Sequence, residues 1–247
     1  MKHSASVVLP TYNEAQTILP IVSQLLDAES VGEIVVVDDD SPDETWRAVA
    51  EQFGVEDVTV IRRTEESGLS SAVLRGFDEA NGDVLACMDA DGQHPVGSAL
   101  TLIRAVESGD DLAVGTRRSA NGEVADDWPV HRRVVSWGAS ALAWSAVPQS
   151  RGLTDPMSGL FAVRADVVEA ARDRLRPTGY KILLELLARC PVDDVAEYGY
   201  TFRERDEGES NLGAAQYLNY VRHLTRLSVP SRRSIDRTAL APSEVQE

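Results

Sequence analysis

The chain has 247 residues, 43% of them hydrophobic, which is enough for one large domain with a substantial core. Its net charge of −16 disfavours free nucleic acid as a partner, and no segment reaches the roughly 18 apolar residues that a membrane span needs. Because an apolar strand begins almost directly after the N-terminal Met-Lys-His-Ser, we expect no signal peptide. The two cysteines, Cys87 and Cys190, lie far apart in apolar surroundings, which indicates buried thiols in a reducing compartment.

Lysine occurs only as Lys2 and Lys181, so nearly all positive charge comes from arginine. An acidic surface that is poor in lysine is expected where proteins must stay hydrated in concentrated salt. We therefore hypothesise a halophilic source. An ordinary acidic cytosolic protein is the alternative.

The first half of the chain alternates apolar strands with amphipathic helices. Strands are predicted at residues 4–9, 33–37, 58–61, 83–88 and 111–115. Helices are predicted at residues 15–26, 43–53, 68–81 and 97–107. Strands that are apolar throughout and alternate with helices are typical of a parallel sheet covered on both faces. The sequence therefore predicts an α/β fold with a mostly parallel central sheet flanked by helices.

The second half is less regular. The polar segment 117–127 predicts a mobile loop, and residues 130–147 predict a helix that is more apolar than one core face requires. That helix either packs on the sheet or forms a surface that meets lipid. A strand ending at 163, helices at 167–172, 182–190 and 214–227, and a strand at 195–202 follow. The segment 228–247 is rich in Pro, Ser and charge, which predicts disorder.

Acidic residues follow three of the predicted parallel strands. Glu14 follows the first strand, Asp38 to Asp40 follow the second, and Asp89 and Asp91 follow the fourth. The carboxyl ends of parallel strands share one edge of the sheet, where ligands bind in open α/β folds. Carboxylates gathered there repel one another unless a cation or hydrogen-bond donors are present. This arrangement favours a functional site.

The stretch M-D-A-D-G-Q-H-P (residues 88–95) offers hard oxygen ligands. The carboxylates of Asp89 and Asp91, with the amide oxygen of Gln93, suit Mg²⁺ or Mn²⁺, which could neutralise a diphosphate leaving group. The alternative is a turn with two solvated acids. Asp38 or Asp39 could accept a hydrogen bond from a nucleobase N–H, or cap a helix instead. No G-x-G-x-x-G follows the first strand and no P-loop motif occurs, which disfavours dinucleotide redox and P-loop chemistry.

Seven motifs in order resemble inverting glycosyltransferases of family 2, in particular the dolichol-phosphate mannose synthase branch. They are L-P-T-Y-N-E (9–14), V-V-D-D-D-S-P-D (36–43), G-L-S-S-A-V-L-R-G-F (68–77), M-D-A-D-G-Q-H-P (88–95), G-T-R (115–117), D-P-M-S-G-L-F (155–161) and F-R-E-R-D-E-G-E-S-N (202–211). The resemblance extends from Val7 to about Leu227. It implies an A-type nucleotide-sugar glycosyltransferase fold and transfer of a hexose onto a polyprenyl or dolichyl phosphate.

The resemblance also implies residue roles by position. The nucleoside would be held by Pro10, Tyr12, Glu14, Val37 and Asp39. The metal and diphosphate would be held by Asp89, Ala90, Asp91 and Gln93. The basic residues that match phosphate-facing positions are Arg117, Arg132 and Arg205, each of which could instead form a surface ion pair.

An acceptor phosphate monoester is already anionic at neutral pH, because its second pKa lies near 6. Its attack therefore needs no general base, only positioning of two anions by the metal and by arginines. This fits the interpretation of His94 as a loop support. Asp155 could orient the acceptor or the sugar hydroxyls, or simply start a turn before Pro156.

Two departures from the family pattern concern the diphosphate. Asn211 stands where the family has a lysine, and Gly92, in place of leucine, should loosen the metal loop. The chain resembles the family type without C-terminal membrane helices. Such enzymes meet lipid through an amphipathic surface or through a membrane partner subunit.

We therefore predict one glycosyltransferase domain over residues 1–228, with a nucleotide-sugar half at 1–116, an acceptor half at 117–228 and a disordered tail at 229–247. It would act at the cytoplasmic face of the membrane as a peripheral enzyme. GDP-mannose is the first expectation for the donor, and UDP-glucose or another donor is an alternative. A sugar-hydroxyl acceptor and a nucleotide-sugar-binding module with weak catalysis are further alternatives.

Overall fold

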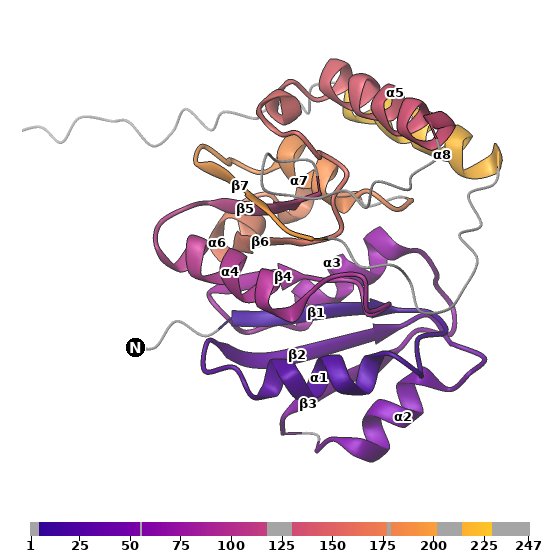
Figure 1. Cartoon of the computed structure of the whole chain (residues 1–247), viewed down its shortest axis with the longest axis vertical. Coiled ribbons are helices and arrows are strands. Elements are labelled where there is room, and N and C mark those ends of the chain that lie inside the picture. The colour runs from indigo at the N-terminus through magenta and orange to yellow at the C-terminus, as the bar shows by residue number, and fades with distance from the viewer. Residues whose placement is uncertain (1–4, 55, 118–129, 177–178, 202–213, 229–247) are drawn as a thin grey trace, which may run out of the picture.

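The computed structural model of the chain describes residues 5–54, 56–117, 130–176, 179–201 and 214–228, and describes only the backbone at 130–136 and 214–219. Within these ranges one seven-stranded sheet has the order β3-β2-β1-β4-β6-β5-β7 (Figure 1). The strands are β1 (Ala5–Thr11), β2 (Val31–Asp38), β3 (Val58–Arg62), β4 (Val84–Cys87), β5 (Leu112–Thr116), β6 (Phe161–Arg164) and β7 (Val195–Gly199).

All strand pairs are parallel except those of β6, which runs antiparallel to both β4 and β5. The mostly parallel sheet predicted from the first half of the sequence is therefore confirmed. The insertion of β6 between β4 and β5 could not be read from the strand–helix alternation, because β6 comes from the less regular second half.

Helices cover the sheet. They are α1 (Ile18–Leu26), α2 (Thr45–Gln52), α3 (Leu69–Glu79), α4 (Val96–Glu107), α5 (Val130–Ala146), α6 (Ala165–Glu169), α7 (Ile182–Arg189) and α8 (Ala214–Leu227). Short 3₁₀ helices at Pro148–Gly152 and Arg172–Arg174 were not predicted from the sequence. The predicted polar loop beyond residue 117 and the predicted tail lie outside the described residues.

The strands are apolar throughout because both faces of the sheet are buried. In β2, Val35 and Val37 join one core cluster, while Ile34 and Val36 join another. Helices α3 and α7 contribute to the first cluster, and α1 and α4 contribute to the second. Burial on both sides by helices accounts for the continuous hydrophobic runs. Both cysteines are buried free thiols, as predicted.

Helix α3 approaches β1 so closely that Gly76 has no space for a side chain. A Cβ at this position would lie 2.4 Å from Cγ1 of Val8 and 3.2 Å from Cγ2 of Val37. This contact holds α3 on the sheet. Since α3 follows β3 and returns along the sheet, its first residues lie at the carboxyl edge of β1 and β2.

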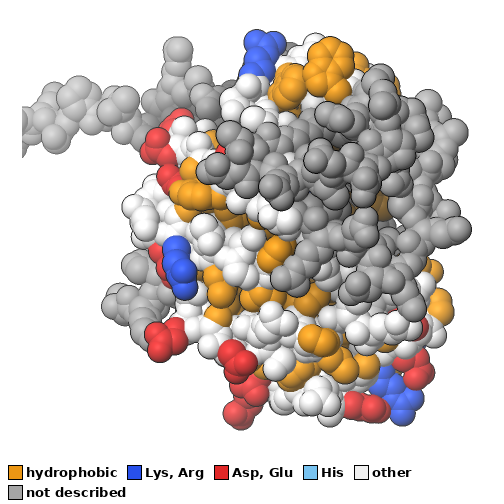
Figure 2. All heavy atoms as spheres, in the orientation of Figure 1, with side chains coloured by type: hydrophobic (Ala, Val, Ile, Leu, Met, Phe, Trp, Pro, Cys, Tyr) orange, Lys and Arg blue, Asp and Glu red, His pale blue; other side chains and the backbone are white. Residues whose placement is uncertain are grey.

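Helices α5 and α8 lie side by side at one end of the molecule (Figure 1), where the Tyr220 hydroxyl donates to the Ala139 carbonyl at 2.8 Å. Ala143 of α5 is buried in the core, but Trp137 and Leu142 are 64% and 51% exposed. Val221 of α8 is 46% exposed. Figure 2 shows hydrophobic side chains at the surface of this end. Helix α5 therefore has a face toward the core and a second apolar face toward solvent.

Candidate active site

A pocket of about 920 Å³ lies at the carboxyl edge of the sheet, toward which the arrows of β1 and β2 point in Figure 1. Its walls come from the loops after β1, β2, β3 and β4 and from the segment before α7. Its acidic lining residues are Glu14, Asp39, Asp40, Glu65, Glu66, Asp89 and Asp91, against a single described basic residue, Arg63. An anionic ligand would need added positive charge to enter such a pocket.

The loops after β1 and β2 hold each other through backbone amides. The N–H of Asn13 donates to Oγ of Ser41 at 3.0 Å, and the N–H of Glu14 donates to Oγ1 of Thr45 at 2.9 Å. Asn13 and Asp40 have φ angles of 60° and 55°, which non-glycine residues rarely adopt. Strained backbone held by cross-loop hydrogen bonds is typical of binding sites.

Asp38 and Asp39 have different roles. Asp38 is fully buried, and its carboxylate accepts from the Thr11 hydroxyl at 2.9 Å and from the Ser41 N–H at 2.8 Å. It therefore fastens the two loops and is excluded as a ligand for a nucleobase. Asp39 lines the pocket and binds Arg63.

The D-A-D loop is held to the loop after β1. The hydroxyl of Thr17 donates to the Ala90 carbonyl at 2.6 Å and lies 3.3 Å from Oε2 of Glu14. The N–H of Gln93 donates to Oδ1 of Asp91 at 3.0 Å, and Gly92 has a φ of 79°. That angle suits glycine and would strain a leucine.

The D-P-M-S-G segment packs directly on Asp89. A Cβ at Gly159 would lie 2.7 Å from Oδ2 of Asp89. A side chain at this position would have to displace the Asp89 carboxylate, so the close approach depends on glycine. The contact explains why a motif about 70 residues further along the chain belongs to the same site.

His94 is buried and supports the backbone of the D-A-D loop. Its Nδ1 accepts the backbone N–H of Asp89 at 3.2 Å, and its ring packs edge-on against Tyr200 at 5.6 Å. Burial lowers the pKa of His94 despite the opposing charges of Asp89 and Asp91. An imidazole whose Nδ1 accepts a backbone hydrogen bond is neutral and is oriented by the fold, which favours the loop-support interpretation.

Arg117 and Asp155 form an ion pair in which Nε and Oδ2 lie 2.9 Å apart. Asp155 is fully buried, and its backbone N–H donates to Oε1 of Glu197 in β7 at 2.9 Å. Burial works to lower the pKa of Arg117, but Asp155 outweighs this effect and raises it. The guanidinium is therefore a permanent positive charge with 24% of its side chain exposed.

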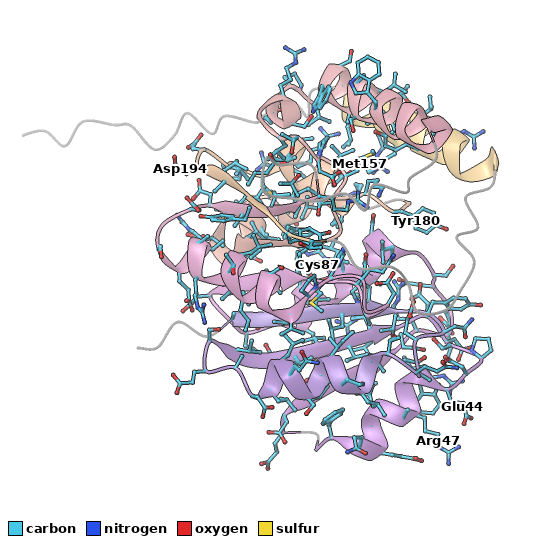
Figure 3. The ribbon with its side chains drawn as sticks, in the orientation of Figure 1. Glu44, Arg47, Cys87, Met157, Tyr180 and Asp194 are labelled. Carbon is cyan, nitrogen blue, oxygen red and sulfur yellow. The ribbon has the colours of Figure 1, made fainter. Side chains whose placement is uncertain are left out.

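Lys181 adds a second positive charge close by. Its Nζ donates to the Met157 carbonyl at 3.1 Å. Burial lowers the pKa of Lys181 and the repulsion of Arg117 lowers it further, while the attraction of Asp155 and Asp89 opposes both effects. Lys181 thus lies within electrostatic reach of both carboxylates. It follows Tyr180, which lines the pocket and in Figure 3 extends toward the side where β1 and β2 end.

Most of the predicted site residues converge. The lining of the pocket contains Pro10, Tyr12, Glu14, Asp39, Asp89, Ala90 and Asp91. Val37 is fully buried in the core and is not part of that lining, nor are Gln93, Arg117 and Asp155. Arg205 and Asn211 lie outside the described residues, and Arg132 is in α5 but its side chain also lies outside them.

Three residues at the site were missed from the sequence: Thr17, Arg63 and Lys181. Arg63 directly follows β3 at the same sheet edge as the acidic clusters, so its position after a strand is the signal that indicates it. Lys181 could have been suspected because it is one of two lysines in the chain. The sequence carries no comparable signal for Thr17.

The residues present suit a hard divalent cation whose remaining coordination positions are filled by a bound ligand. Among the described residues no group of three or more His, Cys, Asp or Glu side chains converges as a preformed metal site. Asp89 and Asp91 nevertheless face the same pocket from one short loop. Mg²⁺ typically binds through one or two carboxylates plus substrate phosphates and water, so this pair fits. No helix in the described part of the chain could span a membrane.

Residues 6–169 match the family model described as glycosyl transferase family 2. A dolichol-phosphate mannosyltransferase of Pyrococcus furiosus is 46% identical over 224 residues, covering 90% of this chain and 63% of its own length. A dolichol-phosphate mannosyltransferase of Mycosarcoma maydis is 37% identical, covering 91% of this chain and 79% of its own length.

A crystal structure of glucosyl-3-phosphoglycerate synthase from Mycobacterium tuberculosis, in complex with Mn²⁺, UDP and glucosyl-3-phosphoglycerate, has the same fold. The TM-score is 0.68 at 22% identity, and the match covers 93% of this chain and 82% of that one. The A-type fold predicted from the sequence motifs is thereby confirmed. At this identity the likeness concerns the fold alone.

Proposed function

This chain belongs to glycosyl transferase family 2, and on that premise we propose that it transfers a mannosyl group from a nucleotide diphosphate sugar to a polyprenyl phosphate. The observation that carries the proposal is its identity to dolichol-phosphate mannosyltransferases over about 90% of its length. The chain spans 63% of the length of the Pyrococcus relative. GDP-mannose is the proposed donor. Residues 1–116 would hold the nucleotide sugar, and residues 117–228 the acceptor, within one domain.

The site suits an acceptor that needs no general base. A phosphate monoester is anionic at neutral pH, so the protein has only to aim it at the sugar carbon and offset its charge. Arg117 and Lys181 are the described cations near Asp89 and Asp155. We assign Arg117 and Arg132 to the acceptor phosphate and Arg205 to the donor diphosphate, as the family pattern implies.

The acidic pocket requires a cation for a diphosphate donor. We propose that Asp89, Asp91 and Gln93 hold Mg²⁺ or Mn²⁺. When bound, the ion would offset the charge of the departing diphosphate. The protein's own part is to hold the two carboxylates in place through Thr17, Gly159 and His94.

A polyprenyl acceptor also requires contact with a membrane. The exposed Trp137, Leu142 and Val221 on α5 and α8 provide an apolar surface in the acceptor half of the chain. We propose that this surface binds peripherally to the cytoplasmic face of the membrane, as interfacial amphipathic helices do. A membrane partner subunit is the alternative to direct contact with lipid.

The alternative of a sugar-hydroxyl acceptor would need a base, for which Asp155 was the candidate. Asp155 is fully buried and bound to Arg117, which makes it a support for the arginine and a poor proton acceptor for a substrate. The geometry therefore favours the phosphate acceptor. A nucleotide-sugar-binding module with weak catalysis is distinguished by turnover alone.

The deciding experiment measures transfer of radiolabelled sugar into an organic-extractable lipid. GDP-mannose and UDP-glucose are compared with Mg²⁺ or Mn²⁺ and with chelator. We expect label from GDP-mannose, lost with chelator and with Asp91→Ala. It should be retained in the control Asp166→Ala, because Asp166 is an exposed acid that pairs with Arg164 and is not part of the pocket lining. Nucleotide binding without any labelled lipid would refute the proposed acceptor.

A further inference from the structure

Two adjacent arginines at the end of β3 bind two adjacent aspartates after β2, in very different surroundings. Arg62 binds Asp40 through Nε and Oδ1 at 2.6 Å, and both side chains are 45% exposed. Arg63 binds Asp39 through Nε and Oδ1 at 2.7 Å, with only 5% and 12% of the two side chains exposed. Arg62 lies over the ring of Trp46 and is not part of the pocket lining, although its partner Asp40 borders the pocket. In the second pair, both Arg63 and Asp39 line the pocket.

The oxygens of Asp39 are unequally occupied. Oδ1 accepts from both Nε and a terminal nitrogen of Arg63. Oδ2 accepts the backbone N–H of Gly68 at 2.7 Å. A carboxylate has about four acceptor positions, so the described contacts leave one of them, on Oδ2. The arginine thus decides which oxygen of Asp39 a ligand in the pocket can use.

Arg63 also closes the loop that follows it. It donates to the Gly68 carbonyl at 3.1 Å and to the Ser71 hydroxyl at 3.0 Å. The loop 64–67, between these anchors, forms part of the pocket wall. Since Nε and both terminal nitrogens of Arg63 bind the protein, the guanidinium suits positioning of neighbours better than direct ligand contact.

We propose that Arg63 positions Asp39 to read the nucleobase of the donor. It directs Oδ2 toward an N–H on the hydrogen-bonding edge of the base and holds loop 64–67 beside it. This inference rests on the proposed function, because it presumes a nucleotide donor. It adds a residue to which no role had been assigned. Lysine cannot replace the arginine, because a point charge cannot occupy Oδ1 from two directions and hold Gly68 and Ser71 together.

The test compares Arg63→Lys with the matched control Arg62→Lys by calorimetric titration. Each variant is titrated with GDP, with UDP and with inorganic pyrophosphate in the presence of Mn²⁺. We expect Arg63→Lys to weaken binding of the nucleoside diphosphate by about tenfold or more, the equivalent of one charge-assisted hydrogen bond. Pyrophosphate binding should be unchanged, and Arg62→Lys should leave both unchanged.

The pyrophosphate titration separates positioning of the base from a structural role. Equal losses of nucleotide and pyrophosphate in Arg63→Lys would show general damage to the pocket and overturn the proposal. So would an unchanged nucleotide affinity. Asp39→Asn provides an independent variant if Arg63→Lys does not fold, and it should lose nucleotide but not pyrophosphate affinity. Equal losses there would also overturn the proposal. If wild-type protein bound neither nucleotide, the proposed function would itself be refuted.

Discussion

The guanidinium of Arg117 lies 2.9 Å from the carboxylate of Asp155, and the pair joins the end of β5 to the turn that precedes β6. Asp155 is in turn held by Glu197, whose carboxylate accepts the backbone N–H groups of both Thr154 and Asp155. A carboxylate fixed in this way orients the arginine.

The first prediction follows from this pairing. Asp155→Asn should reduce transfer to a polyprenyl phosphate by less than about tenfold, because removal of a true general base costs roughly 10²- to 10⁴-fold. The measurement is the initial rate on protein shown by thermal melting to be folded. A loss of a thousandfold or more would instead support a hydroxyl acceptor with Asp155 as base.

The second prediction concerns the contact between Gly159 and Asp89. Gly159→Ala should displace the Asp89 carboxylate and lower metal-dependent transfer by between about ten- and a hundredfold, since small displacements of a catalytic group are costly. Gly97→Ala is the matched control, because a Cβ there meets nothing within 4 Å. Retained Mn²⁺ affinity and turnover in Gly159→Ala would show that the loop adjusts freely.

The third prediction concerns Glu185, which is buried on α7 and accepts from His223 at 3.0 Å and from Arg226 at 3.1 Å, both on α8. Burial works to raise the pKa of Glu185, but these contacts and the Arg176 N–H lower it overall. Its contribution to stability is therefore present above the unfolded pKa near 4.5 and is lost as pH falls through the lower folded pKa.

We expect Glu185→Gln to lower the free energy of unfolding by about 3 kcal/mol at pH 7 and to flatten its decline below about pH 4.5. Urea titrations at several pH values measure both effects. The control is Glu79→Gln, which removes an exposed pair with Arg75 and should cost less than about 1 kcal/mol. If the free energy of unfolding of Glu185→Gln declined below pH 4.5 as steeply as that of the wild type, Glu185 would not be the source of the pH dependence.

The fourth prediction tests the apolar surface of α5. Replacing both Trp137 and Leu142 by serine should reduce co-sedimentation with vesicles that contain polyprenyl phosphate, while GDP binding stays unchanged. Leu26→Ser, on an exposed position of α1, serves as control. Equal sedimentation of the double variant and wild type would indicate that a partner subunit or another surface makes the membrane contact.

The halophilic hypothesis also remains a prediction. With a net charge of −16 and two lysines, the protein should retain activity and stability in molar salt, because counterions screen the repulsion between its acids. Thermal melting and transfer assays across salt concentrations decide this. Activity that is full at low salt and fades in molar salt would count against it.

The sequence by itself determined the sheet, its covered faces and the acidic edge. Continuous apolar strands alternating with helices leave few other solutions, and acids directly after such strands must meet at one edge. The pocket-lining acids Asp39 and Asp91 were therefore identifiable from position alone, whereas Tyr12 was indicated only by the family resemblance. The order of the strands around β6 could not be identified from the sequence, since pairing between distant segments leaves no local pattern.

Only the tertiary structure decided which of two adjacent acids faces the pocket. Asp38 and Asp39 look alike in the sequence, but Thr11 and Ser41 bind the first, while Arg63 and Gly68 orient the second. Only the tertiary structure, likewise, showed that Gly159 lies against Asp89 and that Lys181 lies beside Asp155. The physical reason is that periodicity records which face of an element is buried, whereas hydrogen bonds and charge contacts depend on residues that folding brings together from far along the chain.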